Sequence, residues 1–240
     1  MEKVKRNRLH VGIVLLVTLT AGLFFFSYAP AIAGDRERDR VQGLVNSAQV
    51  TLKEFIGNPD YAWFNANLDH AKGVLIFPRV LKGGFIFGGS GGTGVLLVKD
   101  EKTGKWGEPA YYTLGSLTFG FQIGGEATEI VMLAMTQRAI DSLLSSSFKL
   151  GGDVSIAAGP RGIGTKASMG FPSVTVDFYS FAKSKGLYAG LNLEGSVISV
   201  RDSLNRIYYG KDVTPADIIV RKDVRNIKSA EIRETLQCKC

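Results

Sequence analysis

The chain has 240 residues, of which 45% are hydrophobic and 21% charged, and its formal net charge is +7. This balance is typical of a globular protein, and the length suits one or two domains. The positive charge is spread too thinly for nucleic-acid binding, which needs a dense basic stripe. Only two cysteines occur, both within the last three residues, so the sequence excludes a disulfide framework.

The first 33 residues have the order of a secretory signal peptide. A basic start, Lys3 to Arg8, precedes an uncharged apolar segment over 11–28, and Ala31-Ile32-Ala33 supplies the small residues of a cleavage site. We expect cleavage after Ala33, which gives a mature protein that begins at Gly34 and is exported to the periplasm, the cell surface or the extracellular space. The alternative is an uncleaved anchor, because the apolar segment just reaches the length that spans a bilayer.

Two helices are predicted ahead of any strand. Over 35–56, apolar residues recur at spacings of three and four, and a Gly-Asn-Pro sequence ends the pattern. A second, shorter helix is expected over 60–69. Further along, we expect one helix from Thr136 to about 146 and short helical turns near 202–206 and 215–219.

From residue 73 onward glycines become frequent, and short apolar runs alternate with turn signals. Because tight turns rather than crossover helices join the runs, we expect an antiparallel sheet, and the glycines inside the runs indicate strong curvature. Eight runs are predicted to be strands: 74–77, 84–87, 95–98, 110–114, 117–123, 154–158, 174–181 and 187–193.

The sequence therefore predicts an α+β fold, in which N-terminal helices cover a curved, glycine-rich antiparallel sheet, barrel-like or a sandwich. After the signal peptide at 1–33 we expect a single domain over 34–240, helical at 34–70 and mainly β at 71–220. Residues 221–240 are predicted to be a tail, in which Cys238 and Cys240 have no structural role; the alternatives are a strained bond within the C-x-C sequence and pairing between chains.

The densest glycine run, residues 88–94, matches two functional patterns outside their usual context. Residues 88–92 fit G-x-S-x-G, but the nucleophile Ser90 would need a histidine later in the chain, and the only histidines are His10 and His70. Residues 89–94 fit the dinucleotide pattern G-x-G-x-x-G, but a predicted strand follows where a helix is required. We exclude both functions and interpret the run as a glycine-rich hairpin.

Metal and carboxylate chemistry also lack support in the sequence. One mature histidine and two terminal cysteines cannot form an ordinary zinc site. Glu126 and Glu129 are three residues apart, but no acid or base partner for them is identifiable. We therefore expect a protein that is not an enzyme and needs no cofactor.

A long series of motifs resembles the SYLF domain, a lipid-binding module of eukaryotic adaptor proteins and of many exported bacterial proteins. The resemblance covers about residues 40–220. Its residues are Ala71–Pro78 (AKGVLIFP), Gly83–Gly89 (GGFIFGG), Gly94–Leu96, Trp106, Pro109-Ala110, Gly120–Glu126 (GFQIGGE), Ala157–Pro160, Tyr179–Gly190 (YSFAKSKGLYAG) and Leu193–Gly195. The resemblance implies binding of phosphoinositides and other acidic lipids. Eukaryotic relatives also bind actin filaments, a role that we do not expect of an exported chain.

We therefore expect non-enzymatic binding of anionic lipid at a membrane surface. Cleavage would remove a net charge of +3 and leave +4, which suits an anionic surface and equally serves solubility. The candidate lipid contacts are Lys72, Arg79, Lys82, Arg161, Lys166, Lys183 and Lys185. Of these, Lys183 and Lys185 are expected beside Phe181 at a hairpin tip. The alternative is a structural or envelope-stress protein that acts through a protein partner.

Overall fold

The computed structural model describes residues 34–84, 87–119, 124–160, 176–184 and 193–239. The chain divides into two compact units, 1–40 and 41–240. In the first unit the described residues, 34–40, are helical, and an ion pair joins Arg38 to Asp35. All that follows concerns the second unit.

The second unit begins with helical residues 41–57. A second helical segment follows, in which α2 (Ala62–Asn67) lies between two 3-10 turns, Pro59–Tyr61 and Leu68–His70. Asn58 caps the first turn, because its side chain accepts a hydrogen bond from the Asp60 amide. Both predicted N-terminal helices are therefore confirmed within a few residues.

Eight strands form one sheet in the order β5-β8-β3-β2-β1-β4-β7-β6. All neighbours are antiparallel except β6 and β7, which are parallel. The strands are β1 (Gly73–Gly84), β2 (Phe87–Val98), β3 (Ala110–Phe119), β4 (Gly124–Ala134), β5 (Ser147–Lys149), β6 (Ile156–Ala158), β7 (Phe178–Ser184) and β8 (Val197–Val200).

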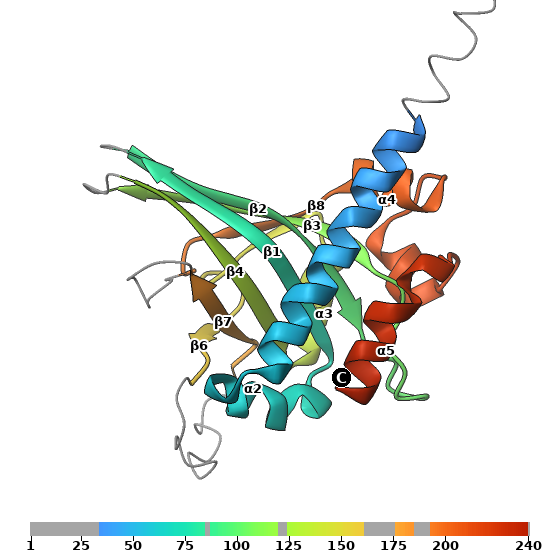
Figure 1. The fold of residues 1–240 in the computed structure, drawn as a ribbon, viewed down its shortest axis with the longest axis horizontal. Helices are drawn as coiled ribbons and strands as arrows, with labels where there is room; N and C mark the ends of the chain where they lie inside the picture. The colour runs from blue at the N-terminus through green and yellow to red at the C-terminus, as the bar shows by residue number, and fades with distance from the viewer. Residues whose placement is uncertain (1–33, 85–86, 120–123, 161–175, 185–192, 240) are drawn as a thin grey trace, which may run out of the picture. The chain divides into compact units, whose positions relative to one another are not determined.

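The sheet is strongly curled (Figure 1). Phe148 of β5 and Phe178 of β7 come from opposite ends of the strand order, yet their rings stack with centroids 5.8 Å apart. The face that carries them is therefore the concave face. Its apolar core includes Leu75, Phe77 and Val80 of β1, and α3 (Gln137–Leu143) packs against it through Ile140 and Leu143. The predicted α+β fold with a curved sheet is confirmed.

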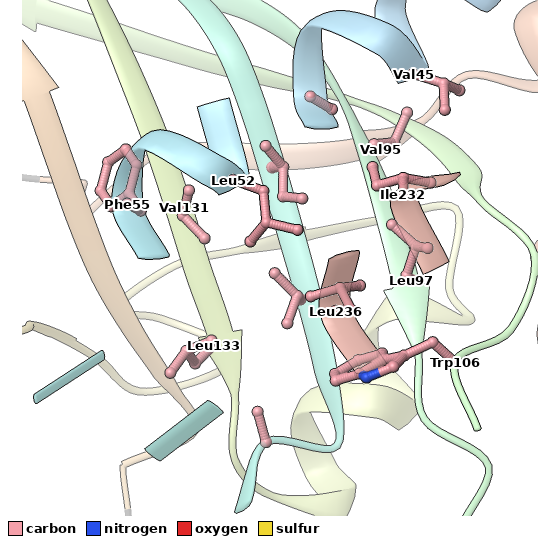
Figure 2. Packing of buried hydrophobic residues seen from close by; sticks show 14 of the residues in the cluster. Val45, Leu52, Phe55, Val95, Leu97, Trp106, Val131, Leu133, Ile232 and Leu236 are labelled. Carbon is pink, nitrogen blue, oxygen red and sulfur yellow. The ribbon is translucent and has the colours of Figure 1, made fainter. Parts of the chain in front are cut away.

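Helices cover the opposite, convex face. Figure 2 shows Leu52 and Phe55 of the helical residues 41–57 near Val131 of β4, and Val45 near Val95 of β2. The helix α5 (Ala230–Cys238) packs beside them through Ile232 and Leu236, both of which are 1% exposed. Burying each of these large side chains contributes about 2 kcal/mol to folding.

The C-terminal part corrects one prediction. Residues 221–240 were expected to be a tail, but they contain a 3-10 turn, Ile227–Ser229, and α5, whose apolar face lies in the core. Half-buried Glu108 fixes this region, because Ser229 Oγ and the Asn226 amide donate to its carboxylate and Arg233 pairs with it. Cys240 lies outside the described residues, so the role expected for the two cysteines is not tested.

Several strand boundaries also differ from the prediction. Residues 110–114 and part of 117–123 form one continuous strand, β3, and residues 124–134, whose type the pattern left open, form β4. The short strands β5 and β8 were missed, and the turn near 202–206 is a full helix, α4 (Asp202–Tyr209). Most of the predicted strand 187–193 lies outside the described residues.

The glycine run 88–94 lies inside β2, not in a hairpin turn, and the reason is an irregularity in β1. Ile76 pairs with Val95 of β2, but Val80 pairs with Gly92, so four steps along β1 correspond to three along β2. The register against β4 shifts by one residue at the same place. The strand β1 therefore contains one extra residue, a β-bulge. The β1 backbone approaches β2 closely here. A Cβ atom on Gly94 would lie 2.3 Å from the carbonyl oxygen of Ile76, and one on Gly92 would lie 2.6 Å from that of Arg79. Glycine is therefore required by close packing at both positions.

Candidate functional site

The structure does not gather the candidate cations into one patch. Arg161, Lys166 and Lys185 lie outside the described residues. Lys72 immediately precedes β1 and Lys82 is near its far end, which at about 3.3 Å per residue separates them by roughly 30 Å. Arg79 is an exposed residue of the β1 irregularity, and Lys183 lies on β7.

Lys183 is committed to contacts within the fold. Its Nζ donates a hydrogen bond to Glu54 Oε2, and it lies 3.9 Å from Glu129 Oε2. The hydrogen bond to Glu54, together with the charges of both carboxylates, raises the pKa of Lys183 above its ordinary value. The side chain therefore ties β7 and β4 to the helical residues 41–57.

Lys72 borders a cavity of about 380 Å³, which we call the lysine-lined cavity. This volume is in the range of ordinary small-ligand sites. Four parts of the chain form it: the residue before β1, the end of β2 with the turn that follows it, the helix α3, and the segment 218–222. Its charged lining consists of Lys72, Lys99, Lys102 and Lys222 with Asp100, Glu101 and Glu108.

One wall of the lysine-lined cavity is apolar and is built from a π-helix, Asp217–Arg221. Within it Ile218 is 1% exposed and anchors the segment to the core, while Val220 is 59% exposed at the cavity. Lys222 ends the π-helix with a left-handed backbone, φ 58°. Such π-helical turns and left-handed non-glycine residues are uncommon and are often found at functional sites.

The four lysines differ in how firmly they are held. Ion pairs join Lys72 to Glu101 and Lys222 to Asp100. Lys99 Nζ donates to the Asp69 carbonyl oxygen at 3.0 Å and lies 5.7 Å from the centre of the Trp106 ring.

The side chain of Lys102 makes no ion pair within the described part of the chain. The Asp100 side chain instead shapes the turn beneath it, because its Oδ1 accepts hydrogen bonds from the amides of Lys102 and Thr103. Among the described residues, an anion at the cavity would therefore meet two ammonium groups without a carboxylate partner, those of Lys99 and Lys102, and two that carboxylates on the cavity rim hold.

The residues considered for catalysis do not assemble. Ser90 lies in β2, paired with Lys82 and Ser116, whereas His70 lies before the opposite end of β1. Within the described ranges, no group of three His, Cys, Asp or Glu side chains is placed to hold a metal ion. In those same ranges, no helix is long and apolar enough to cross a membrane.

Sequence reasoning found Lys72 but missed its neighbours in the cavity. Lys99 and Lys102 lie around the turn that follows β2 and were not among the lipid contacts predicted from the sequence. Lys222 follows this turn by about 120 residues, inside the segment predicted to be a tail. The one available signal was the density of lysines around the turn, which is also common in solvated turns.

Comparison with known proteins gives a consistent family assignment. Residues 115–238 match the model of the Ysc84 family, described as "Las17-binding protein actin regulator". The chain is 39% identical over 150 residues to an SH3 domain-containing protein of Schizosaccharomyces pombe. These residues make up 61% of this chain and 34% of that protein. It is 32% identical over 167 residues to the human SH3 domain-containing YSC84-like protein 1. These residues make up 69% of this chain and 48% of the human protein.

A third relative is the LAS seventeen-binding protein 3 of Saccharomyces cerevisiae, 36% identical over 154 residues, which cover 63% of this chain and 33% of that protein. The chain thus spans half or less of the length of these curated relatives. Two of them are named for an SH3 domain, and the third is named for binding LAS seventeen. The family model covers more than half of the chain, so this protein belongs to the Ysc84 family and contains its SYLF domain.

Proposed function

We propose that this domain binds anionic phospholipid headgroups at the lysine-lined cavity, without catalysis, in an exported protein of the periplasm or cell surface. The observation that supports the proposal most is the combination of four lysines with an apolar wall around one cavity of about 380 Å³. A phospholipid has the matching parts, because a charged phosphate adjoins apolar chains.

The physical basis is electrostatic attraction with a small apolar contribution. Each lysine near an anionic membrane surface contributes about 1 kcal/mol, and lysine binds phosphate as a point charge. A headgroup phosphate at the rim competes with Asp100 and Glu101 for Lys222 and Lys72. The exposed Val220 then lies where the first methylene groups of the lipid begin.

The test is a vesicle co-flotation assay with two charge-matched variants. Lys102→Gln with Lys222→Gln removes two cavity charges, and we expect affinity for phosphatidylglycerol vesicles to fall about tenfold to thirtyfold. Lys53→Gln with Lys149→Gln removes two exposed charges outside the cavity lining. This control should retain affinity within about threefold. Equal losses in the two variants would mean that the cavity has no special role.

A protein partner is the second candidate function, and the relatives' names favour it. One relative is named for binding LAS seventeen, and the family description includes Las17 binding. The present chain spans about a third of that relative. If a protein partner were the main ligand, the chain would bind neutral and acidic vesicles equally and would still capture a specific protein.

A further inference from the structure

Lys82, near the C-terminal end of β1, lies on the concave face of the sheet. In a regular strand, where side chains alternate between the two faces, it would lie on the convex face. Ile76 lies in the convex-face core, and in a regular strand every even-numbered residue of β1 would share that face. The extra residue between Phe77 and Val80 reverses the alternation, because Val80 packs into the concave-face core. Lys82 therefore follows Val80 onto the concave face.

The same reversal puts Leu81 on the convex face, where it is 51% exposed. The strand thus presents leucine to solvent and a half-buried lysine to its concave side, the opposite of the usual arrangement. Violations of this kind cost stability and are expected mainly at functional sites. Bulges that redirect a side chain are likewise frequent near such sites.

Two hydroxyl groups continue the row that Lys82 begins. Lys82 pairs with Ser90 of β2, and Ser90 pairs with Ser116 of β3. Directly opposed residues have Cβ atoms about 5 Å apart, so the three side chains lie side by side across three strands. All three are half-buried, and within the described part of the chain none makes a side-chain hydrogen bond or ion pair.

We propose that Lys82, Ser90 and Ser116 form a second anion site, which takes a phosphate group on the concave face of the sheet. One ammonium and two hydroxyl donors in a row match the oxygens of a phosphate, and charge-assisted hydrogen bonds of this kind are strong. Glu126 holds the register position beside Lys82 on β4. The anion therefore lies toward β2 and β3, where the hydroxyls are.

This site is distinct from the lysine-lined cavity. Lys82 lies near the C-terminal end of β1, roughly 30 Å along the strand from Lys72. The phosphate can belong to a lipid headgroup or to a soluble phosphate ester, because both present the same oxygens. A soluble phosphate ester and a lipid vesicle, used as two separate ligands, distinguish the two sources.

The experiment measures binding of soluble glycerol phosphate and of phosphatidylglycerol vesicles to the full chain and its variants. We expect Lys82→Gln to weaken binding about tenfold or more, and Ser90→Ala and Ser116→Ala about threefold to tenfold each. Lys149→Gln, which removes an exposed cation of β5, is the control and should stay within about twofold. Thermal unfolding of each variant shows that the fold is intact.

A Lys82-dependent signal with glycerol phosphate identifies a soluble-ester site, and one confined to vesicles identifies a headgroup site. If Lys82→Gln changes neither signal in a folded protein, the proposal is wrong. That outcome is independent of the lysine-lined cavity, because the Lys102 and Lys222 variants test the cavity separately. Chemical shifts of the Ser90 and Ser116 amides on titration with glycerol phosphate give a second readout, and unshifted amides would also overturn it.

Discussion

Lys183 of β7, which the sequence predicts to contact lipid, donates a hydrogen bond to Glu54 in the helical residues 41–57 and so joins a helix to the sheet. The two side chains are 35% and 42% exposed, and pairs this exposed contribute little. We expect Lys183→Gln and Glu54→Gln each to lower the free energy of unfolding by less than about 1 kcal/mol. A double-mutant cycle in urea measures the coupling.

The Lys183 variant should also leave vesicle affinity within about twofold. The raised pKa of Lys183 means that the pair stabilises the fold below the unfolded pKa and loses this effect as the pH rises through the folded pKa. A large loss of lipid affinity in folded Lys183→Gln would restore this lysine to the binding surface.

A buried carboxylate provides a second prediction. Asp177 is 4% exposed and accepts hydrogen bonds from Thr136 Oγ1, Ser155 Oγ and the Ser155 amide, while Arg138 pairs with it. Burial by itself would raise the pKa of Asp177, but these hydrogen bonds and the guanidinium lower it below its usual value. The carboxylate therefore stabilises the fold above the unfolded pKa near pH 4, and this contribution disappears as the pH falls through the lower folded pKa.

We expect Asp177→Asn to lower the free energy of unfolding by about 2–3 kcal/mol at pH 7, and the difference from wild type to shrink as both proteins are acidified below pH 4. Urea unfolding across this pH range measures it. Asp212→Asn is the control, because Asp212 is 88% exposed and should change stability by less than about 0.5 kcal/mol. A pH-independent difference would show that the charge of Asp177 is unimportant.

The glycines of the sheet provide a third prediction. Gly94→Ala places a Cβ 2.3 Å from the Ile76 carbonyl oxygen and 2.5 Å from the Phe77 ring, so it should cost about 3 kcal/mol or prevent folding. Gly115→Ala meets nothing within 4 Å and should be neutral or stabilise by about 0.5 kcal/mol. Thermal unfolding of the two variants provides the comparison, and equal effects would contradict the close approach of β1 to β2.

These glycines illustrate what sequence reasoning can and cannot predict. Glycine frequency and the absence of crossover helices correctly indicated a curved antiparallel sheet, because both are local features of the chain. The extra residue in β1 is not visible in the pattern Phe77–Leu81, so the placement of Lys82 and the reason for Gly94 were missed. The tail prediction failed because α5 carries few apolar residues, and only packing reveals that Ile232 and Leu236 face the core.

The candidate site likewise depends on contacts that the sequence pattern does not predict. Lys72 could be proposed from the sequence, but the lysine-lined cavity joins it to Lys102 and Lys222, which are close only in the fold. Lys183 could be proposed as well, but its partner Glu54 is 129 residues away along the chain. Contacts over such separations leave no local pattern in one sequence.

Export provides a fourth prediction. The basic start, the apolar segment and the Ala31-Ile32-Ala33 site predict a mature protein that begins at Gly34. Intact-mass measurement of protein recovered from an expressing cell's exterior or periplasm checks this. A mass that retains residues 1–33 would indicate a membrane anchor, and recovery from the cytoplasm alone would contradict export.

Recruitment of this domain by anionic headgroups can be measured by vesicle co-flotation of the wild-type protein. We expect its affinity for phosphatidylglycerol-containing vesicles to exceed that for phosphatidylcholine vesicles about tenfold or more, since several lysines contribute about 1 kcal/mol each. We also expect this preference to decline as added salt screens the surface charges. Equal flotation with both vesicle types, or a preference that salt leaves unchanged, would contradict it.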